Sequence, residues 1–248
     1  MPDAAFEVIE LRRYLVEPDR RDDFVALFDR EFTEAQEACG MVPIGHFRDR
    51  DDPRGFVWFR GFAHAEQRAR ALTAFYRESQ AWQDHRAAAN GALLDNDDVL
   101  LLRDARPGSG FDPRRLARPA GTQTRAPSTV AVAVLMLTRA ADEALVTAFE
   151  AEMLPQLAER AGRTSYFVTD ARANDFPALP VREGEFAFVV TGVCANDDAL
   201  HAWSDAFAPE TLPPAMREQL LRCDVLRLEP APRSIYGNEM FAPTALAT

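Results

Sequence analysis

The pattern of hydrophobic and polar positions follows one order twice along the 248 residues. Runs rich in β-branched and aromatic residues predict strands, and apolar residues three or four apart predict helices. The first series predicts strands at 6–16, 42–49, 56–62 and 99–102, with helices at 18–40 and 64–92. The second predicts strands at 129–137, 165–169, 186–193 and 225–228, with helices at 142–161 and 196–221. Each series is therefore a ferredoxin-like β-α-β-β-α-β unit.

Matching short motifs support a duplication of this unit. The motif Asp98-Val99-Leu100-x-Leu102 ends the first series, and Asp224-Val225-Leu226-x-Leu228 ends the second. Shared motifs in a fixed order are the signature of internal repeats. We predict a first repeat at 1–104, a linker rich in Pro, Gly and Arg at 105–127, a second repeat at 128–230 and a tail at 231–248.

The predicted fold class is α+β, with tandem ferredoxin-like repeats that form a fold of the dimeric α/β barrel type. Each unit would have a four-stranded antiparallel sheet with helices on one face, so the other face needs a cover. Two units can cover each other, and the space between their sheets is a natural place for a small molecule. The barrel could close within one chain or between two chains, and we expect a homo-oligomer.

Composition narrows the possible functions. The chain has 39 acidic residues and 28 basic ones, all of them arginine, and a net charge of −11. The absence of lysine excludes a Schiff-base lysine and a P-loop lysine. The acidic balance disfavours a nucleic-acid partner, and the longest apolar run, 130–137, is too short to span a membrane. Three scattered cysteines and an N-terminus unlike a signal peptide predict a cytoplasmic protein without a structural metal.

Polar residues alternate along the strands of the first series. Glu10, Arg12 and Tyr14 share one face of the first strand, His46 lies on the second, and Trp58 and Arg60 lie on the third. We expect these side chains to line one cavity between the two sheets.

The residue types suggest a role for each of these side chains. His46 is the candidate general base because its ordinary pKa is near neutrality. Glu10 and Tyr14 complete the catalytic set, with Tyr14 donating to an oxyanion, while Arg12 and Arg60 would hold an anionic substrate oxygen. Trp58 and His85 are further candidates for substrate binding.

A purely structural interpretation competes with this one. Glu10, Arg12 and Arg60 could form a buried ion-pair network that fixes the register of the strands. In the same interpretation His46 is a core histidine, and His85 is a surface residue of the second helix.

The first half resembles the NIPSNAP family of the dimeric α/β barrel superfamily. The segments that carry the resemblance are Glu10-Leu11-Arg12-Arg13-Tyr14, Phe28-Asp29-Arg30-Glu31-Phe32, Gly45-His46-Phe47, 56–62, 82–86 and 96–100. The resemblance implies the barrel but no single reaction, because the superfamily includes cofactor-free monooxygenases, lactone isomerases, haem-binding enzymes and binding proteins.

Three hypotheses about function follow. The first is an enzyme that acts without metal or cofactor on an apolar or aromatic carbonyl, phenol or lactone, as an isomerase, cyclase or monooxygenase. The second is a non-catalytic binding or scaffold protein. The third is a haem-binding protein with His85 or His46 as the axial ligand.

Overall fold

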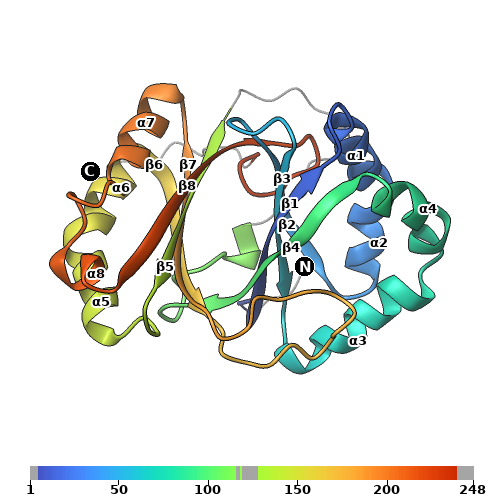
Figure 1. Cartoon of the computed structure of the whole chain (residues 1–248), viewed down its shortest axis with the longest axis horizontal. Coiled ribbons are helices and arrows are strands. Elements are labelled where there is room, and N and C mark those ends of the chain that lie inside the picture. Colours follow the sequence, from blue (N-terminus) through green and yellow to red (C-terminus); the bar gives the residue numbers. More distant parts are fainter. Residues whose placement is uncertain (1–4, 116–117, 119–127, 239–248) are drawn as a thin grey trace.

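The computed structural model describes residues 5–115, 118 and 128–238. It contains eight strands: β1 (Val8–Val16), β2 (Val42–Asp49), β3 (Gly55–Phe62), β4 (Leu93–Asp104), β5 (Thr129–Leu137), β6 (Ala161–Thr169), β7 (Phe186–Cys194) and β8 (Leu220–Pro230). They form one closed antiparallel barrel in the order β1-β3-β2-β8-β5-β7-β6-β4. The expected α+β fold is confirmed, and the barrel closes within a single chain (Figure 1).

Helices cover the barrel from two opposite sides (Figure 1). The first unit carries α1 (Arg21–Leu27), α2 (Thr33–Ala38), α3 (Arg68–Thr73) and α4 (Gln80–Asn90), and the second carries α5 (Glu143–Ala148), α6 (Leu154–Arg160), α7 (Asp197–Asp205) and α8 (Pro214–Arg217). Single π-helical turns join three of the helix pairs, at Phe28–Phe32, Ala74–Glu78 and Phe149–Met153, and 3-10 turns lie at Ala65–Gln67 and Pro113–Arg115.

Two seams join the four-stranded sheets of the units. At one seam β2 pairs with β8, from Phe47 opposite Pro230 to Asp49 opposite Leu228. At the other seam β4 pairs with β6, from Leu102 opposite Thr169 to Asp104 opposite Phe167. At each seam one of the two strands, β8 or β4, extends beyond the range expected from the sequence, and these extensions let one chain close the barrel.

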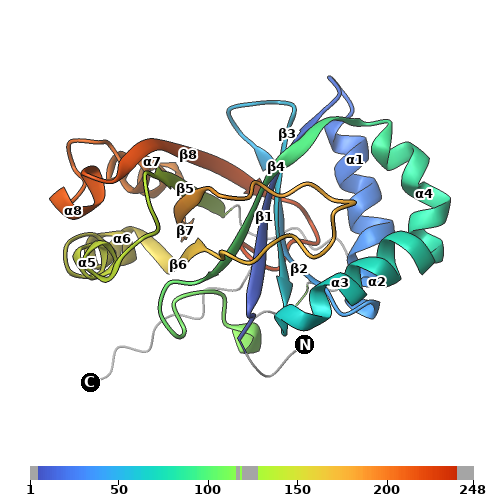
Figure 2. The ribbon, with the colours of Figure 1, turned by 60° about the horizontal axis from the view of Figure 1, so that its bottom comes forward.

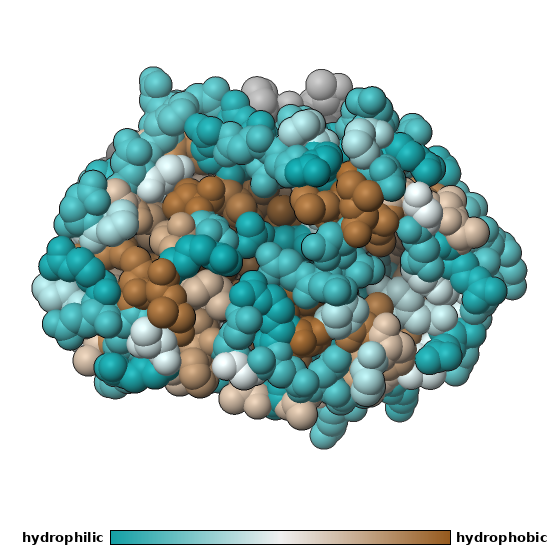
Figure 3. All heavy atoms as spheres, viewed as in Figure 1, coloured by the Kyte–Doolittle hydropathy of each residue, from teal (hydrophilic) through white to brown (hydrophobic). Residues whose placement is uncertain are grey.

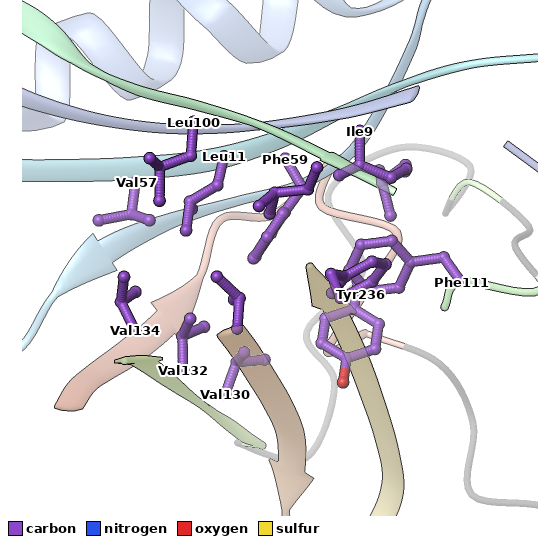
Figure 4. Close-up of a cluster of buried hydrophobic side chains, with 14 of the residues drawn as sticks. Ile9, Leu11, Val57, Phe59, Leu100, Phe111, Val130, Val132, Val134 and Tyr236 are labelled. Atoms are coloured by element: carbon purple, nitrogen blue, oxygen red, sulfur yellow. The ribbon is translucent and has the colours of Figure 1, made fainter. Parts of the chain in front are cut away.

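Apolar side chains fill the interior of the barrel. The first unit contributes Ile9, Leu11, Val57, Phe59 and Leu100, which face Val130, Val132 and Val134 of the second unit (Figure 4). All are at most 2% exposed, and each contributes on the order of 1.5–3 kcal/mol through burial. The prediction of a cavity between the two sheets is therefore wrong, because large apolar side chains occupy that space.

The segments expected as linker and tail also contribute to this core. Phe111 and Tyr236 lie inside it with ring centroids 4.9 Å apart (Figure 4). Both residues are buried, so these two segments help to close the barrel as well as connect or follow the units.

The face of the molecule shown in Figure 3 is mainly hydrophilic, with hydrophobic residues gathered in patches between hydrophilic ones. Within the described part of the chain, no helix combines the length and apolar character needed to cross a membrane.

Candidate functional site

The polar face of the first sheet points away from the barrel interior and lies beneath α1–α4. Ile9 and Leu11 point into the barrel, so strand alternation turns Glu10, Arg12 and Tyr14 to the opposite face. His46 and Trp58 pair across β2 and β3 and pack against the same helices. The structure thus brings most of the predicted residues to one face, which is the helix-covered face and not the inner one.

A fully buried carboxylate gathers three arginines on this face. Glu10 accepts hydrogen bonds from Arg12 Nη1 at 2.9 Å, Arg60 Nε at 3.0 Å and Arg68 Nε at 2.8 Å. All four side chains are at most 2% exposed. Burial alone would raise the pKa of Glu10, but the three guanidinium charges hold it well below its usual value. Glu10 is therefore ionised at neutral pH.

A cavity of about 660 Å³ lies between this sheet and the helices. Its walls are largely aromatic, as in many small-molecule sites. The aromatic lining residues are Tyr14, Phe24, Phe28, Phe32, Trp58, Phe75, Tyr76, Trp82 and Phe176. Their edge-to-face arrangement is shown by Phe28 and Trp58, whose ring centroids are 5.0 Å apart at an interplanar angle of 72°.

Hydrogen-bond donors are concentrated where the cavity meets the sheet. Arg12 Nε donates to the Tyr14 hydroxyl at 2.6 Å, and Arg60 Nη1 donates to the Tyr76 hydroxyl at 3.3 Å. Each phenol oxygen thus accepts from a guanidinium, which leaves its own proton for another acceptor. Burial raises the pKa of Tyr14, although Arg12 opposes this, so the phenol is protonated at neutral pH.

Two further donors on this face of the sheet have no partner among the described residues. They are the indole Nε1 of Trp58, a side chain 2% exposed, and Nη2 of the fully buried Arg12. Unpaired buried donors are costly, and they commonly mark a position where a water, ion or ligand binds.

His46 lies on the same face but does not line the cavity. Its Nε2 contacts Asp29, and its ring lies 4.9 Å from the ring of Phe28, which separates it from the cavity. Burial lowers the pKa of His46 despite the opposing effect of Asp29. As placed here, the imidazole cannot take a proton directly from a molecule in the cavity.

His85 lies outside the cavity lining as well. Its side chain is 33% exposed on α4, with Nε2 3.4 Å from a carboxylate oxygen of Glu31. Neither His46 nor His85 therefore fits the position of an axial haem ligand in this cavity, and the remaining lining residues are not histidines.

A loop from the second unit completes the cavity. Residues 170–185 connect β6 and β7 and reach across to the helices of the first unit (Figure 2). The ends of the loop are hydrogen-bonded to β4, through Asp170 N to Leu101 O and Arg182 N to Val99 O. Its tip is held by an ion pair between Asp175 and Arg68, and Phe176 closes the cavity wall.

Sequence reasoning missed the contributions of Arg68, Tyr76 and Phe176. Tyr76 lies on the apolar face of the helix predicted at 64–92, and this position could have indicated that its side chain turns towards the sheet. Arg68 and Phe176 carried no signal, because their positions depend on contacts between segments more than 100 residues apart.

The equivalent space in the second unit is filled. Leu145, Phe149, Met153 and Trp203 are fully buried between the second sheet and its helices. The described residues thus show this aromatic, donor-rich cavity in the first unit and a fully buried hydrophobic cluster at the equivalent place in the second.

Solved structures with the same fold match more than nine-tenths of the chain. A "putative monooxygenase" from Lactobacillus acidophilus is 14% identical and matches 92% of this chain and 95% of its own, with a TM-score of 0.53. An "anthrone oxidase-like protein" is 12% identical and matches 93% of each chain, with a TM-score of 0.53. These similarities show a shared fold, that of the tandem dimeric α/β barrel.

Half-length similarity to NIPSNAP domains, expected from the first-half motifs, is found as well. A NIPSNAP-like domain protein from Burkholderia xenovorans is 23% identical and matches 43% of this chain and 90% of its own, with a TM-score of 0.38. No family model and no curated protein matches the sequence.

Proposed function

We propose that this protein is a small-molecule enzyme of the monooxygenase type that acts on an aromatic phenol or carbonyl compound in the first-unit cavity. The observation that carries the proposal is the set of donors at the base of an aromatic cavity, namely Tyr14, Tyr76 and Trp58. The names of the full-length structural neighbours, a "putative monooxygenase" and an "anthrone oxidase-like protein", support the same reaction class.

The donors would act on an oxygen of the substrate. Negative charge on a phenol or enol oxygen is delocalised into the attached ring, and this makes a ring carbon electron-rich. Preorganised donors in a site that excludes water stabilise such an oxyanion more strongly than water does. Arg12 would act through Tyr14, because its Nε holds the phenol oxygen and leaves the phenol proton for the substrate.

Molecular oxygen is the co-reactant in this proposal. In the case of anthrone, the central CH₂ carbon loses two protons and gives electrons to O₂. One oxygen atom becomes the new carbonyl of anthraquinone, and the other leaves as water. The aromatic walls would hold the flat ring system, and the loop at 170–185 would limit access of solvent.

The test measures oxygen uptake and quinone formation with anthrone and with a naphthol as probes. We expect uptake above the uncatalysed rate and a loss of about 10²-fold in kcat for Tyr14→Phe. Arg222→Gln, on an exposed residue of the second unit, is the matched control and should behave as wild type. If no probe is oxidised faster with protein than without it, the enzyme proposal fails.

A binding protein is the second candidate, and one observation favours it. The described lining of the cavity contains no Asp, Glu or His that could serve as a general base. Retention of an aromatic ligand without oxygen uptake would support this alternative.

A further inference from the structure

The lining of the first-unit cavity changes from apolar inside to polar at its mouth. Deep in the cavity, Phe28, Phe32 and Phe75 are at most 4% exposed. The exposed residues of the lining, which mark the mouth, are Arg77, Arg86, Asn90 and Ala178. A ligand that fills the cavity would therefore keep an apolar body inside and place a polar end at the mouth.

One face of α4 supplies much of this polar mouth. Trp82 belongs to the aromatic wall, while Gln83, Arg86 and Asn90 line the cavity at helical spacing beside it. Gln83 Nε2 donates to the backbone oxygen of Arg77 at 3.1 Å, and Gln83 and Arg86 are neighbours on the helix surface. Arg77 and Arg86 therefore flank Gln83 on the same side of the mouth.

The guanidinium groups of these two arginines are free. Neither makes an ion pair or a hydrogen bond with the described residues, whereas most of the described arginines pair with a carboxylate. The described lining also contains no Asp or Glu. In a chain of net charge −11, two unpaired cations at a mouth without acids give this place a local positive potential.

We infer that the cavity selects aromatic ligands that carry a carboxylate, which Arg77 and Arg86 hold at the mouth while the rings lie among the aromatic walls. A carboxylate suits this place because it is planar and matches the donor fork of a guanidinium. The inference rests on the proposed function for the choice of cavity, and it deepens that function by naming the substrate class. That class is a hydroxyaromatic carboxylic acid whose acid group lies at the end away from the reacting oxygen.

The experiment compares two probes that differ in charge. They are 6-hydroxy-2-naphthoic acid, which is a carboxylate at neutral pH, and its uncharged methyl ester, and their Kd values are measured by calorimetry at low salt. We expect the acid to bind about tenfold more tightly, which two exposed ion pairs can supply together. Added salt should reduce this preference, because exposed charges are screened.

Variants assign the preference to the two arginines. In the double variant Arg77→Gln, Arg86→Gln the acid should lose about tenfold in affinity, while the affinity for the ester stays as in wild type. Arg70→Gln is the matched control, because Arg70 is exposed on α3 of the same unit but does not line the cavity. It removes a charge of the same sign and should keep the preference for the acid. Both mouth arginines are exposed and unpaired, so the double variant should keep the wild-type Tm.

Several outcomes would overturn the inference. They are equal or tighter binding of the ester, absence of binding by both probes, an unchanged preference in the double variant, and an equal loss in Arg70→Gln. A double variant that loses both probes alike would also overturn it, because the arginines would then act on the shape of the cavity and not on the charge of the ligand.

These outcomes are separable from the failure of the proposed function. A preference for the acid without oxygen uptake leaves the carboxylate site standing and removes the oxygenase. Oxygen uptake with equal affinity for the acid and the ester does the reverse.

Discussion

Replacing Glu10 by Gln tests the most heavily buried charge cluster of the molecule. The glutamine has nearly the shape of glutamate, but it removes the one negative charge that contacts all three arginines. Removal of one partner from a buried ion pair costs about 3–5 kcal/mol, because the remaining charge is left uncompensated. For a chain of this length the cost corresponds to a decrease in Tm of roughly 6–20 °C.

The assay is urea unfolding of wild type and Glu10→Gln between neutral and acidic pH. Glu143→Gln, which breaks an ion pair of Arg106 with a carboxylate side chain 77% exposed, is the matched control and should cost less than about 1 kcal/mol. In the folded protein the pKa of Glu10 lies well below its ordinary value of 4.5, because the three arginines outweigh the effect of burial. The stability that its charge contributes is thus fully present above about pH 4.5 and is lost as the pH falls towards the folded-state pKa.

The difference in unfolding free energy between the two proteins should therefore shrink on acidification, by up to about 1.4 kcal/mol per pH unit. Acid effects on all other carboxylates cancel in this difference. A cost for Glu10→Gln as small as that of Glu143→Gln, or a cost that does not change with pH, would refute the claim that this carboxylate balances the buried arginines.

Further predictions concern the loop and the histidine. Phe176→Ala should remove part of the cavity wall that the second unit provides and raise KM about tenfold with little change in kcat, and it should lower Tm because the ring is buried, as measured by steady-state kinetics and thermal unfolding. A decrease in kcat at constant KM would contradict a wall role. His46→Ala should lower the unfolding free energy by about 2–4 kcal/mol, because it empties a buried site and strands Asp29, while turnover per folded molecule stays within a few-fold of wild type. Because burial lowers the pKa of His46, its contribution to stability is fully present above about pH 6.5 and lost below its folded-state pKa. Loss of turnover with unchanged stability would instead support the role of general base that the sequence suggested for His46.

The order of elements was predictable because hydrophobic periodicity is a local property. The strands and helices of both units were found in the expected order. The start of β4 was not predicted, since Asp95, Asn96 and Asp97 are disfavoured in strands. Asp95 nevertheless pairs with Leu15 at the end of β1, and Asn96 and Asp97 lie where the register shifts. That extension depends on a partner strand about 80 positions away, which no local pattern encodes.

Several residues of the candidate site could be predicted from the sequence, but the side of the sheet on which the site lies could not. Alternation places Glu10, Arg12 and Tyr14 on one face whatever the tertiary structure. It cannot say which face turns towards the barrel, since Ile9 and Leu11 on one side and Tyr14 on the other are all buried. The second unit determines which face turns inward, because its valines at 130–134 pack favourably only against an apolar face of the first sheet. Glu10 and Arg60 therefore face the helices, where Arg68 donates to Glu10 and Tyr76 accepts from Arg60.

The two units have come to differ in what lies between sheet and helices. In the second unit Phe149 and Trp203 fill that space, and the loop between β6 and β7 extends to the other unit. In the first unit the space remains open and is closed by Phe176 from that loop. A duplication that only stabilised the barrel would require neither the open cavity nor the reaching loop. The second unit therefore serves the first in two ways, as the apolar partner that turns the polar face outward and as the source of the wall that completes the cavity.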